Sequence, residues 1–407
     1  MSAVTKAVDC HQRAFRSYLL HLFHSTTMSF GKKTSFYTVH NEVELVRGGA
    51  DHFDLLYRLI DNAKESIYIR IYILDDDHTG SVIAEKLVSA ARRNVQVYIL
   101  ADGYASQGLS HAFRSRLLSN GIHFRYFEPL LRSTHFYFGR RLHEKIVVVD
   151  RLHALVGGIN MADRYNDIDA IPAWLDYSIY VKGEAAFHLY KYCASDWSAE
   201  LDPSLPDDLP LHQCSVRVSR NDWVKGKHQV WRTYFNWFNF ADESITIMCS
   251  YFLPGRVLRK RLAMAAARGA KVRIILAGPS DVMLAKHAER YLYSYMLKNG
   301  IEIYEYQPTV LHAKMMVVDD RLFTIGSFNV NNVSAYASVE LNLDIRNKPF
   351  ACSVRQTLDS IIEKDCIRVT EKNFISNATF FKRFIQKSSY EIIRGVLNLS
   401  TFYFKHE

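Results

Sequence analysis

Cysteine is scarce in this sequence, and the cysteines present are not paired. Six of them are spread over 407 residues without a CxxC motif: Cys10, Cys193, Cys214, Cys249, Cys352 and Cys366. Structural zinc sites and disulfide-rich small domains need cysteines at close, regular spacing. The sequence therefore predicts free thiols in a reducing compartment, and it indicates neither a disulfide framework nor a zinc site.

Long apolar runs are also missing, and acidic residues are scarce at the start of the chain. No apolar run approaches the roughly 20 residues that cross a bilayer, so a lipid-modifying enzyme of this sequence would act from the membrane surface. Residues 1–36 contain five lysines or arginines, and Asp9 is their only acidic residue. Such a composition is typical of an organellar transit peptide or of a surface extension, and we favour the extension.

The excess of basic residues points to an anionic partner. The formal net charge is +9 and the pI is about 9.1. Either nucleic acid or an acidic lipid surface would satisfy this charge, and the charge alone does not separate them.

One short motif, HxKx4D, occurs twice. Its members are His143, Lys145 and Asp150 in the first copy and His312, Lys314 and Asp319 in the second. An asparagine follows each histidine after 17 residues, within GGIN or GSFN: Asn160 and Asn329. Two copies with the same downstream spacing make a coincidence improbable. The sequence therefore predicts one composite active site built from two halves.

The spacing within each motif has a chemical interpretation. Residues i and i+2 of a strand face the same way, so each His–Lys pair would project from one face. Asp150 and Asp319 have the opposite parity, and we expect them to close strand pairs in turns. Two imidazoles, two ammonium groups and two amides suit a phosphodiester. One histidine would attack phosphorus, the other would protonate the leaving alcohol, and Lys with Asn would neutralise the phosphoryl oxygens.

On these residues the chain resembles the phospholipase D superfamily, from about Glu42 to about Asp365. The segments GGINMADRYN, WLDYSIYVKG and NGIEIYEYQPTVLHAKMMVVDD look most like bacterial cardiolipin synthases, especially the shorter type without N-terminal membrane spans. The resemblance implies a catalytic set, and it needs no cofactor and no metal because His and Lys supply the charge. That set is His143, Lys145, Asp150, His312, Lys314 and Asp319, with Asn160, Asn329 and Ser327 binding the phosphate.

The resemblance also implies one acidic residue in each half that orients a catalytic histidine. The candidates are Asp176, 33 residues after its histidine, and Glu340, 28 residues after its own. The longer distance indicates a small insertion around Asn166 to Pro172. The sequence leaves open whether each carboxylate serves its own half or the other.

An internal duplication organises the chain. Each half is predicted to run strand, helix, strand, helix, strand and then the HxK hairpin, which gives an α/β fold with helices on both faces of each sheet. A proline-rich acidic stretch has linker composition. We expect an extension at 1–40, two phospholipase D-like halves at 41–200 and 214–370 joined by a linker at 201–213, and a basic amphipathic tail at 371–407. Pseudo-twofold packing would bring the HxK hairpins together at the interface of the halves.

Two segments combine aromatic or apolar residues with cations. The first half has a longer path from its NG turn to its histidine, and this segment is predicted to face a membrane through Arg132, Phe136, Tyr137, Phe138, Arg140 and Arg141. A stacking surface for bases and a solvated loop are the alternatives. The tail from Phe380 to Leu397 is predicted to be a basic amphipathic helix that lies in a membrane interface or docks on the protein, with neither favoured.

The sequence thus predicts a phosphatidyltransferase of the cardiolipin synthase type that uses phosphatidylglycerol or a related phospholipid. His143 is expected to be the nucleophile and His312 the general acid and then base. The predicted partner is an anionic phospholipid membrane, with nucleic acid less favoured, and the predicted location is the cytoplasm, peripheral on the inner face of the cell membrane. A phospholipase D-type hydrolase of lipid or nucleic acid and a non-catalytic binder are the alternatives.

Overall fold

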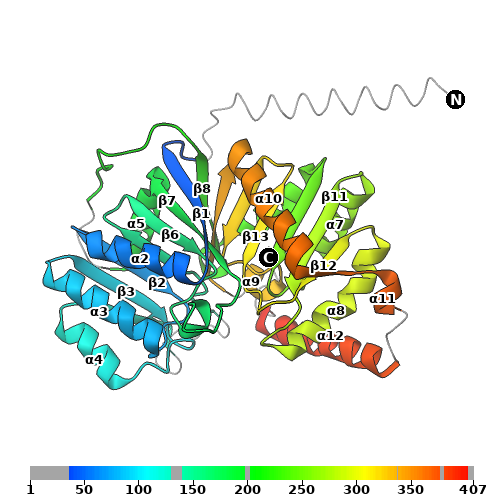
Figure 1. The fold of residues 1–407 in the computed structure, drawn as a ribbon, viewed down its shortest axis with the longest axis horizontal. Coiled ribbons are helices and arrows are strands. Elements are labelled where there is room, and N and C mark those ends of the chain that lie inside the picture. The colour runs from blue at the N-terminus through cyan, green and yellow to red at the C-terminus, as the bar shows by residue number, and fades with distance from the viewer. Residues whose placement is uncertain (1–35, 130–139, 198–201, 337, 376–379, 402–407) are drawn as a thin grey trace. The chain divides into compact units, whose positions relative to one another are not determined.

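The computed structural model describes residues 36–129, 140–197, 202–336, 338–375 and 380–401. Two mixed β-sheets organise these residues (Figure 1). The first sheet has the strand order β1-β7-β6-β5-β2-β3-β4. Its strands are β1 (Asn41–Arg47), β2 (Ser66–Ile71), β3 (Gln96–Asp102), β4 (His123–Phe127), β5 (Ile146–Val149), β6 (His153–Gly157) and β7 (Tyr177–Gly183).

The second sheet repeats this topology and adds a short strand at each edge. Its order is β16-β12-β11-β10-β13-β14-β15-β8-β9. The strands are β8 (Ser215–Asp222), β9 (Lys227–His228), β10 (Ser244–Cys249), β11 (Lys271–Ala277), β12 (Glu302–Tyr306), β13 (Lys314–Val318), β14 (Leu322–Gly326), β15 (Glu340–Arg346) and β16 (Cys366–Val369). In both sheets the strands that alternate with helices pair in parallel, and the HxK hairpin pairs antiparallel. The predicted duplication is therefore confirmed.

Helices cover both faces of each sheet, as predicted. Helices α2 (Ala50–Asn62), α3 (His78–Arg92) and α4 (His111–Ser119) pack on one face of the first sheet, and α5 (Glu184–Ala194) packs on the other. Helices α6 (Gln229–Phe240), α7 (Arg256–Ala267) and α8 (Met283–Lys298) correspond to α2–α4 in the second half, and α10 (Lys348–Asp365) corresponds to α5. The remaining helical segments are η1 (Asp163–Tyr165), η2 (Trp223–Lys225), α9 (Asn332–Tyr336), α11 (Glu371–Ile375) and α12 (Phe380–Thr401).

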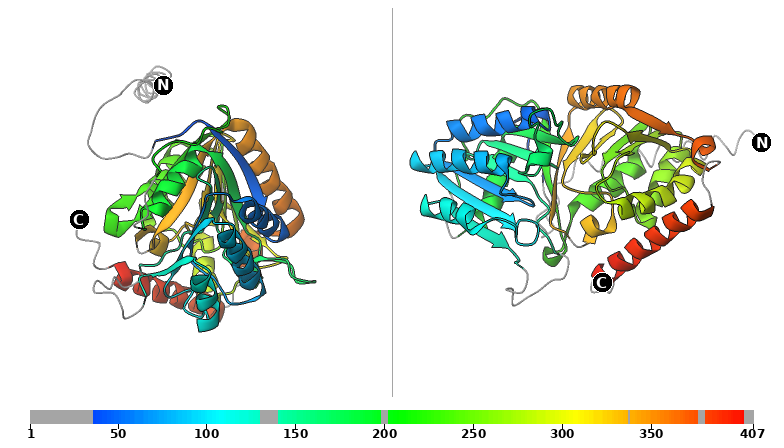
Figure 2. Two further views of the ribbon diagram at one scale, coloured as in Figure 1. Left: turned by 90° about the vertical axis from the view of Figure 1, so that its left-hand side faces the viewer. Right: turned by 60° about the horizontal axis from the view of Figure 1, so that its bottom comes forward.

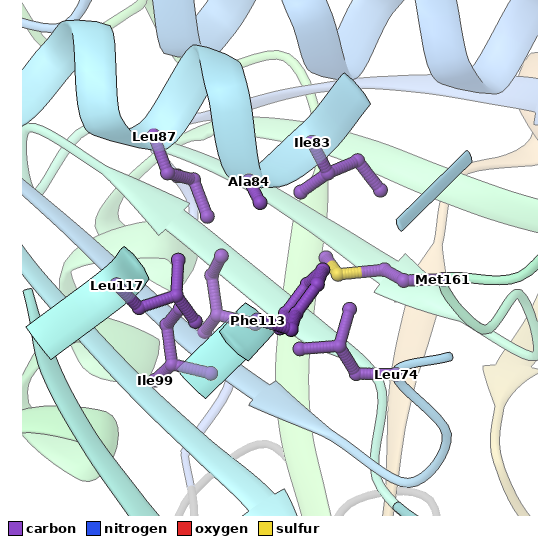
Figure 3. Close-up of a pocket in the computed structure, with 9 residues that line it drawn as sticks. Leu74, Ile83, Ala84, Leu87, Ile99, Phe113, Leu117 and Met161 are labelled. Atoms are coloured by element: carbon purple, nitrogen blue, oxygen red, sulfur yellow. The ribbon is translucent and has the colours of Figure 1, made fainter. Parts of the chain in front are cut away.

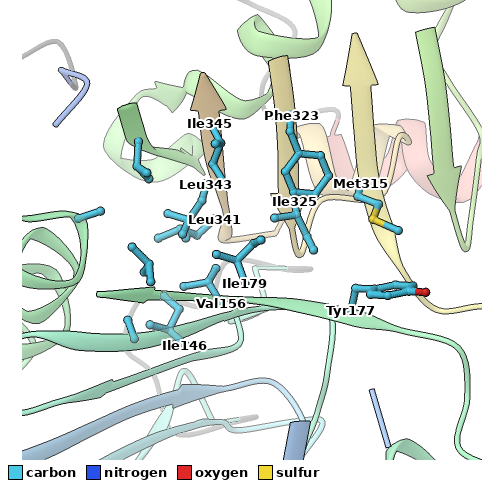
Figure 4. Packing of buried hydrophobic residues seen from close by; sticks show 14 of the residues in the cluster. Ile146, Val156, Tyr177, Ile179, Met315, Phe323, Ile325, Leu341, Leu343 and Ile345 are labelled. Carbon is cyan, nitrogen blue, oxygen red and sulfur yellow. The ribbon is translucent and has the colours of Figure 1, made fainter. Parts of the chain in front are cut away.

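A shared hydrophobic core joins the two sheets. Side chains from β5, β6 and β7 of the first sheet meet side chains from β13, β14 and β15 of the second, together with α5 and α10. Figure 4 shows Ile179 and Tyr177 on one side of this core and Phe323, Ile325 and Met315 on the other. Because the burial of apolar area is the main favourable term in folding, this core holds the two halves together. It therefore fixes the two HxK segments relative to each other.

Two tight turns close the HxK hairpins. Asp150 and Arg151 have positive φ angles of 49° and 62°, and Asp319 and Asp320 have 51° and 49°. Two successive residues with positive φ define the type I′ turn that matches the twist of a two-stranded hairpin. Aspartate tolerates this conformation better than most residues, which explains its place at the turn.

The interior of the first half is tightly packed. Figure 3 shows a small void between α3, α4 and the sheet, lined by Leu74, Ile83, Phe113, Met161 and neighbouring apolar side chains. With no polar group in its lining, the void is a packing defect and offers no chemistry.

Among the described residues, no helix combines the length and the apolar run that crossing a bilayer requires.

Candidate active site

Each catalytic-motif histidine is held by a carboxylate from the other half of the chain. Nδ1 of His143 lies 2.9 Å from Oε2 of Glu340, and Nδ1 of His312 lies 2.7 Å from Oδ2 of Asp176. Both carboxylates are almost completely buried. A carboxylate at Nδ1 fixes the tautomer that carries its proton there and leaves Nε2 with a lone pair. The site therefore exists only when the two halves are joined.

Backbone pairing between the halves sets this crossed arrangement. The N–H of His143 donates to the carbonyl of Val339 at 3.0 Å, and the N–H of His312 donates to the carbonyl of Leu175 at 2.8 Å. Val339 and Leu175 directly precede the two carboxylates in the sequence. Each histidine is thus placed beside the carboxylate of the other half by backbone hydrogen bonds between the halves.

The two lysines lie beside the imidazoles and are buried. Nζ of Lys145 donates to the carbonyl oxygen of His143 at 2.6 Å. Nζ of Lys314 lies 3.1 Å from Nδ1 and 3.2 Å from Nε2 of His312. Only 4% of Lys145 and 1% of Lys314 is exposed, so their charges act in a region of low dielectric.

The site is electrostatically prepared for an anion. Burial, followed by the charge of Lys314, lowers the pKa of Lys145 to about 7. Burial also lowers the pKa of Lys314. A negative phosphodiester placed between these ammonium groups would raise both pKa values again, because it favours their charged forms. Strongly perturbed groups of this kind are characteristic of functional sites.

Both imidazoles are biased toward the neutral form. Burial and then the charge of Lys314 lower the pKa of His312 to about 3. Burial lowers the pKa of His143, against the opposing charge of Glu340. Burial would raise the pKa of Asp176, but the hydrogen bond and charge of His312 and the charge of Lys314 bring it below its usual value. A neutral imidazole has the lone pair on Nε2 that nucleophilic attack requires.

The asparagines of the GGIN and GSFN segments lie at the ends of the central strands. Asn160 accepts a hydrogen bond from the N–H of Ile73 at 3.1 Å and donates to the hydroxyl of Tyr165 at 2.9 Å. That hydroxyl lies 3.5 Å from Nε2 of His312. Asn329 accepts a hydrogen bond from Ser250 at 2.8 Å. Asn160 of the first half is therefore linked to the histidine of the second.

Ser327, which was predicted to bind the phosphate, contacts the strand that carries Glu340. Its hydroxyl donates to Oε2 of Glu340 at 2.5 Å and accepts the N–H of Leu341 at 3.1 Å. Both interactions engage the hydroxyl with the segment that carries the carboxylate. Ser327 thus positions Glu340, which in turn holds His143.

The two motif aspartates, taken above as part of the catalytic set, also do not join the reacting groups. Asp150 accepts the backbone N–H groups of residues 64–66 at 2.7–3.0 Å, and Asp319 accepts those of residues 242–244 at 2.9–3.3 Å. These N–H groups precede or begin the central strands β2 and β10, whereas Ile73, which binds Asn160, follows β2. The aspartates therefore hold the turn of each hairpin, at the end away from the asparagines. Their position seven residues after the histidines predicted this place in the turns.

The segment predicted to face a membrane needs a partial correction. Arg140 is only 8% exposed, and it forms ion pairs with Glu128 and, at 2.9 Å, with Asp222. It therefore supports the structure and does not face a membrane. The guanidinium of Arg141 lies 5.0 Å from the centre of the Tyr104 ring. The other predicted members, Arg132, Phe136, Tyr137 and Phe138, lie outside the described residues.

Aromatic rings around the imidazoles were not predicted. The ring of Tyr72 lies edge-on to His143 at 4.8 Å between centroids, and that of Tyr165 lies edge-on to His312 at 5.1 Å. Trp174 approaches His312 to 6.1 Å. Trp174 lies two residues before Asp176, and Tyr165 lies five residues after Asn160. This closeness in sequence to predicted site residues could have identified both rings. The rings exclude water from one side of each imidazole, which strengthens the electrostatic interactions there.

Comparisons with known proteins agree with this site. A family model described as "Cardiolipin synthase, PLD-like domain" matches residues 56–170 and 234–362, one match in each half. Cardiolipin synthase B of Salmonella typhi is 31% identical over 81% of this chain and 83% of its own length. Cardiolipin synthase B of Escherichia coli K12 is 29% identical over the same shares.

A solved structure shows the same fold at lower sequence identity. Phosphatidylserine synthase from Haemophilus influenzae superposes with a TM-score of 0.71 at 16% identity, covering 91% of this chain and 97% of that protein. With the family model matching both halves and the crossed histidine–carboxylate pairs in place, the chain belongs to the cardiolipin synthase family, the phospholipid phosphatidyltransferases of the phospholipase D superfamily.

Proposed function

We propose that this enzyme transfers a phosphatidyl group from phosphatidylglycerol, or a closely related phospholipid, to the hydroxyl of a second phosphatidylglycerol. The observation that carries the proposal is the crossed pairing of two histidines with two carboxylates, because it provides two imidazoles with distinct roles around one phosphorus atom. The names of the related synthases support cardiolipin as the product.

In the first step Nε2 of His143 attacks phosphorus while the bond from phosphorus to the glycerol oxygen breaks. His312 gives its proton to that oxygen, and glycerol leaves. The incoming phosphodiester is negatively charged, and this charge raises the pKa of His312, which favours the protonated imidazole. Lys145, Lys314 and the two asparagines stabilise the charge on the phosphoryl oxygens.

In the second step His312 acts as a base. It takes the proton from the hydroxyl of a second phosphatidylglycerol, whose oxygen attacks phosphorus and displaces His143. The products are cardiolipin and regenerated enzyme. We assign the nucleophile to His143 and the acid to His312, as expected from the sequence. His143 has the more accessible ring, with 15% of its side chain exposed against 8% for His312.

The described cysteines support action in a reducing compartment. Those at 193, 214, 249, 352 and 366 are all free thiols. We propose that the enzyme works on the inner face of the cell membrane, where such thiols stay reduced.

The experiment that tests the function is product analysis. Pure protein is incubated with phosphatidylglycerol vesicles, and the lipids are separated. Cardiolipin with released glycerol supports transfer. Phosphatidic acid as the only lipid product would replace the proposal with hydrolysis, and binding without turnover would replace it with a scaffold role.

The order of the two histidines has a separate test. Enzyme is mixed with phosphatidylglycerol labelled in its phosphate and quenched in alkali, which preserves phosphohistidine. Label on the peptide that contains His143 supports the assignment, and label on the peptide that contains His312 reverses it.

A further inference from the structure

The C-terminal helix both docks on the protein and presents an apolar face outward. Helix α12 packs along α8 (Figure 2). The rings of Tyr390 and Tyr291 lie 4.8 Å apart between centroids, tilted by 32°, and Ser389 is buried. Four large apolar side chains on α12 are nevertheless 54–69% exposed: Phe381, Phe384, Ile392 and Val396. Their spacing places them on one side of the helix. The tail helix therefore docks on the protein, which is one of the two predicted alternatives. Its exposed apolar face can still lie in a membrane interface, which is the other.

A groove lies beside the line where α12 meets α8. Its volume is about 630 Å³, and α7 and α11 complete its walls. Among the described residues that line the groove, four are basic and none is acidic. The basic residues are Arg259, Lys298, Arg383 and Lys387.

Aromatic side chains stand among these cations. Tyr291 and Tyr295 line the groove, and the guanidinium of Arg259 lies 5.5 Å from the centre of the Tyr295 ring. Tyrosine is enriched at membrane interfaces because its ring is apolar and its hydroxyl is hydrated. A groove lined by several cations suits a phosphate group.

The groove is connected to the active site by the course of the two helices. The C-terminal half of α8 lines the groove with the N-terminal part of α12, so the helices are antiparallel. Helix α12 also contacts α9, which follows Asn329 and its GSFN segment. The start of α8 carries three exposed apolar residues, Val282, Met283 and Leu284, next to Asp281, which accepts the hydroxyl of Tyr251 at 2.6 Å.

We propose that the groove between α8 and α12 binds the phosphate head group of an anionic phospholipid within a bilayer, while the exposed apolar residues of α12 insert among its acyl chains. This second lipid site is separate from the catalytic histidines, and it would hold the active-site end of α8 and α12 against the membrane. It rests on the proposed action at a phospholipid surface. Cations with aromatic rings also suit single-stranded nucleic acid. The adjacent apolar face favours lipid, since interfacial helices combine the two features.

A charge-removing pair of substitutions tests the groove. Lys298→Gln with Lys387→Gln should weaken sedimentation of the full chain with phosphatidylcholine vesicles that contain phosphatidic acid by about 30-fold, equivalent to about 2 kcal/mol for two basic residues at an anionic surface. Phosphatidic acid is suitable because it has no alcohol leaving group for the catalytic site. Turnover of detergent-dispersed phosphatidylglycerol should not change, which separates failure of this site from failure of the proposed function.

The matched control removes the same charge from the opposite face of the second sheet. Lys348→Gln with Lys364→Gln on α10 should change vesicle binding less than about threefold, because exposed charges are screened beyond about 10 Å. If the two double variants lost the same amount of vesicle binding, the loss would reflect the net charge of the protein. That result would overturn the proposed site. Wild-type binding by the groove variant, or a loss of binding to single-stranded DNA with vesicle binding intact, would also overturn it.

A third variant covers the case in which the groove substitutions lower the melting temperature. Phe384 is 60% exposed, so Phe384→Ser leaves the docked face of α12 untouched. It should weaken binding to the same vesicles about tenfold through lost apolar burial. Unchanged binding by this folded variant would show that α12 does not insert.

Discussion

The two halves of the active site share one plan but hold their carboxylates differently. In the first half, Oδ1 of Asp176 accepts the backbone N–H of Tyr177 at 2.7 Å, and Oδ2 faces His312. In the second half, Oε2 of Glu340 receives both His143 and Ser327, and the buried Oε1 has no hydrogen-bond partner among the described residues. The shorter carboxylate is thus held by a backbone N–H, whereas the longer one is held by a side chain through only one of its two oxygens.

The residue that lies against each carboxylate also differs between the halves. Gly158 occupies the position that Ser327 has in the second half, and a Cβ at Gly158 would come within 2.5 Å of both oxygens of Asp176. The first half therefore requires glycine where the second uses a hydroxyl. The duplicated halves have diverged where each carboxylate is held, and we propose that this difference serves the two roles proposed for the imidazoles.

Loss of either histidine should have the largest effect. His143→Ala and His312→Ala should each lower kcat by about 100-fold to 10,000-fold or more. General acid–base assistance alone contributes a factor in this range. Turnover is measured on phosphatidylglycerol vesicles, with circular dichroism as the control for folding. Substantial activity in either folded variant would contradict the two-histidine mechanism.

The residues beneath the carboxylates should differ in sensitivity. Gly158→Ala should lower kcat about 100-fold, since displacing a positioned group by about 1 Å has that effect. Ser327→Ala should cost only about tenfold, because it removes one hydrogen bond to a carboxylate. The pH profile distinguishes positioning from general damage, and Ser327→Thr, which keeps the hydroxyl, should recover activity. Equal losses at the two positions would remove the proposed difference between the halves.

The pH dependence should report Lys145. Because its pKa is lowered to about 7, this lysine is charged below that pH and neutral above it, whereas an exposed lysine stays charged to about pH 10. The charged form binds the phosphate, so kcat/KM, which reports free enzyme, should fall about fivefold from pH 7 to pH 8. Lys145→Arg keeps its charge and should lose this decline, even if its activity is low. A decline that persists in the arginine variant would assign the titration to another group.

The smallest effect is expected from metal removal. The imidazoles and ammonium groups supply the nucleophile and the positive charge, so dialysis against EDTA should leave turnover on vesicles unchanged. A large loss that one specific divalent cation restores would contradict the metal-free mechanism in both halves.

Local spacing made much of the fold and site accessible from sequence. The strand and helix order of each half, the hairpin turns at Asp150 and Asp319, and the positions of the histidines all depend on residues within about 20 positions of one another. Periodicity and turn preference act over that range. The contact between Ser327 and Glu340 was not predicted because it forms between neighbouring strands. The burial of Arg140 depends on Asp222 in the other half.

By itself, the sequence determined that there are two equivalent halves, which imidazoles and ammonium groups they contribute, and which carboxylates are available. Only the tertiary structure decided that Glu340 serves His143 and that Asp176 serves His312. The physical reason is that these partners are separated by 197 and 136 residues, and they meet only because the shared core between the sheets aligns two backbone segments. No local preference of the chain encodes that alignment.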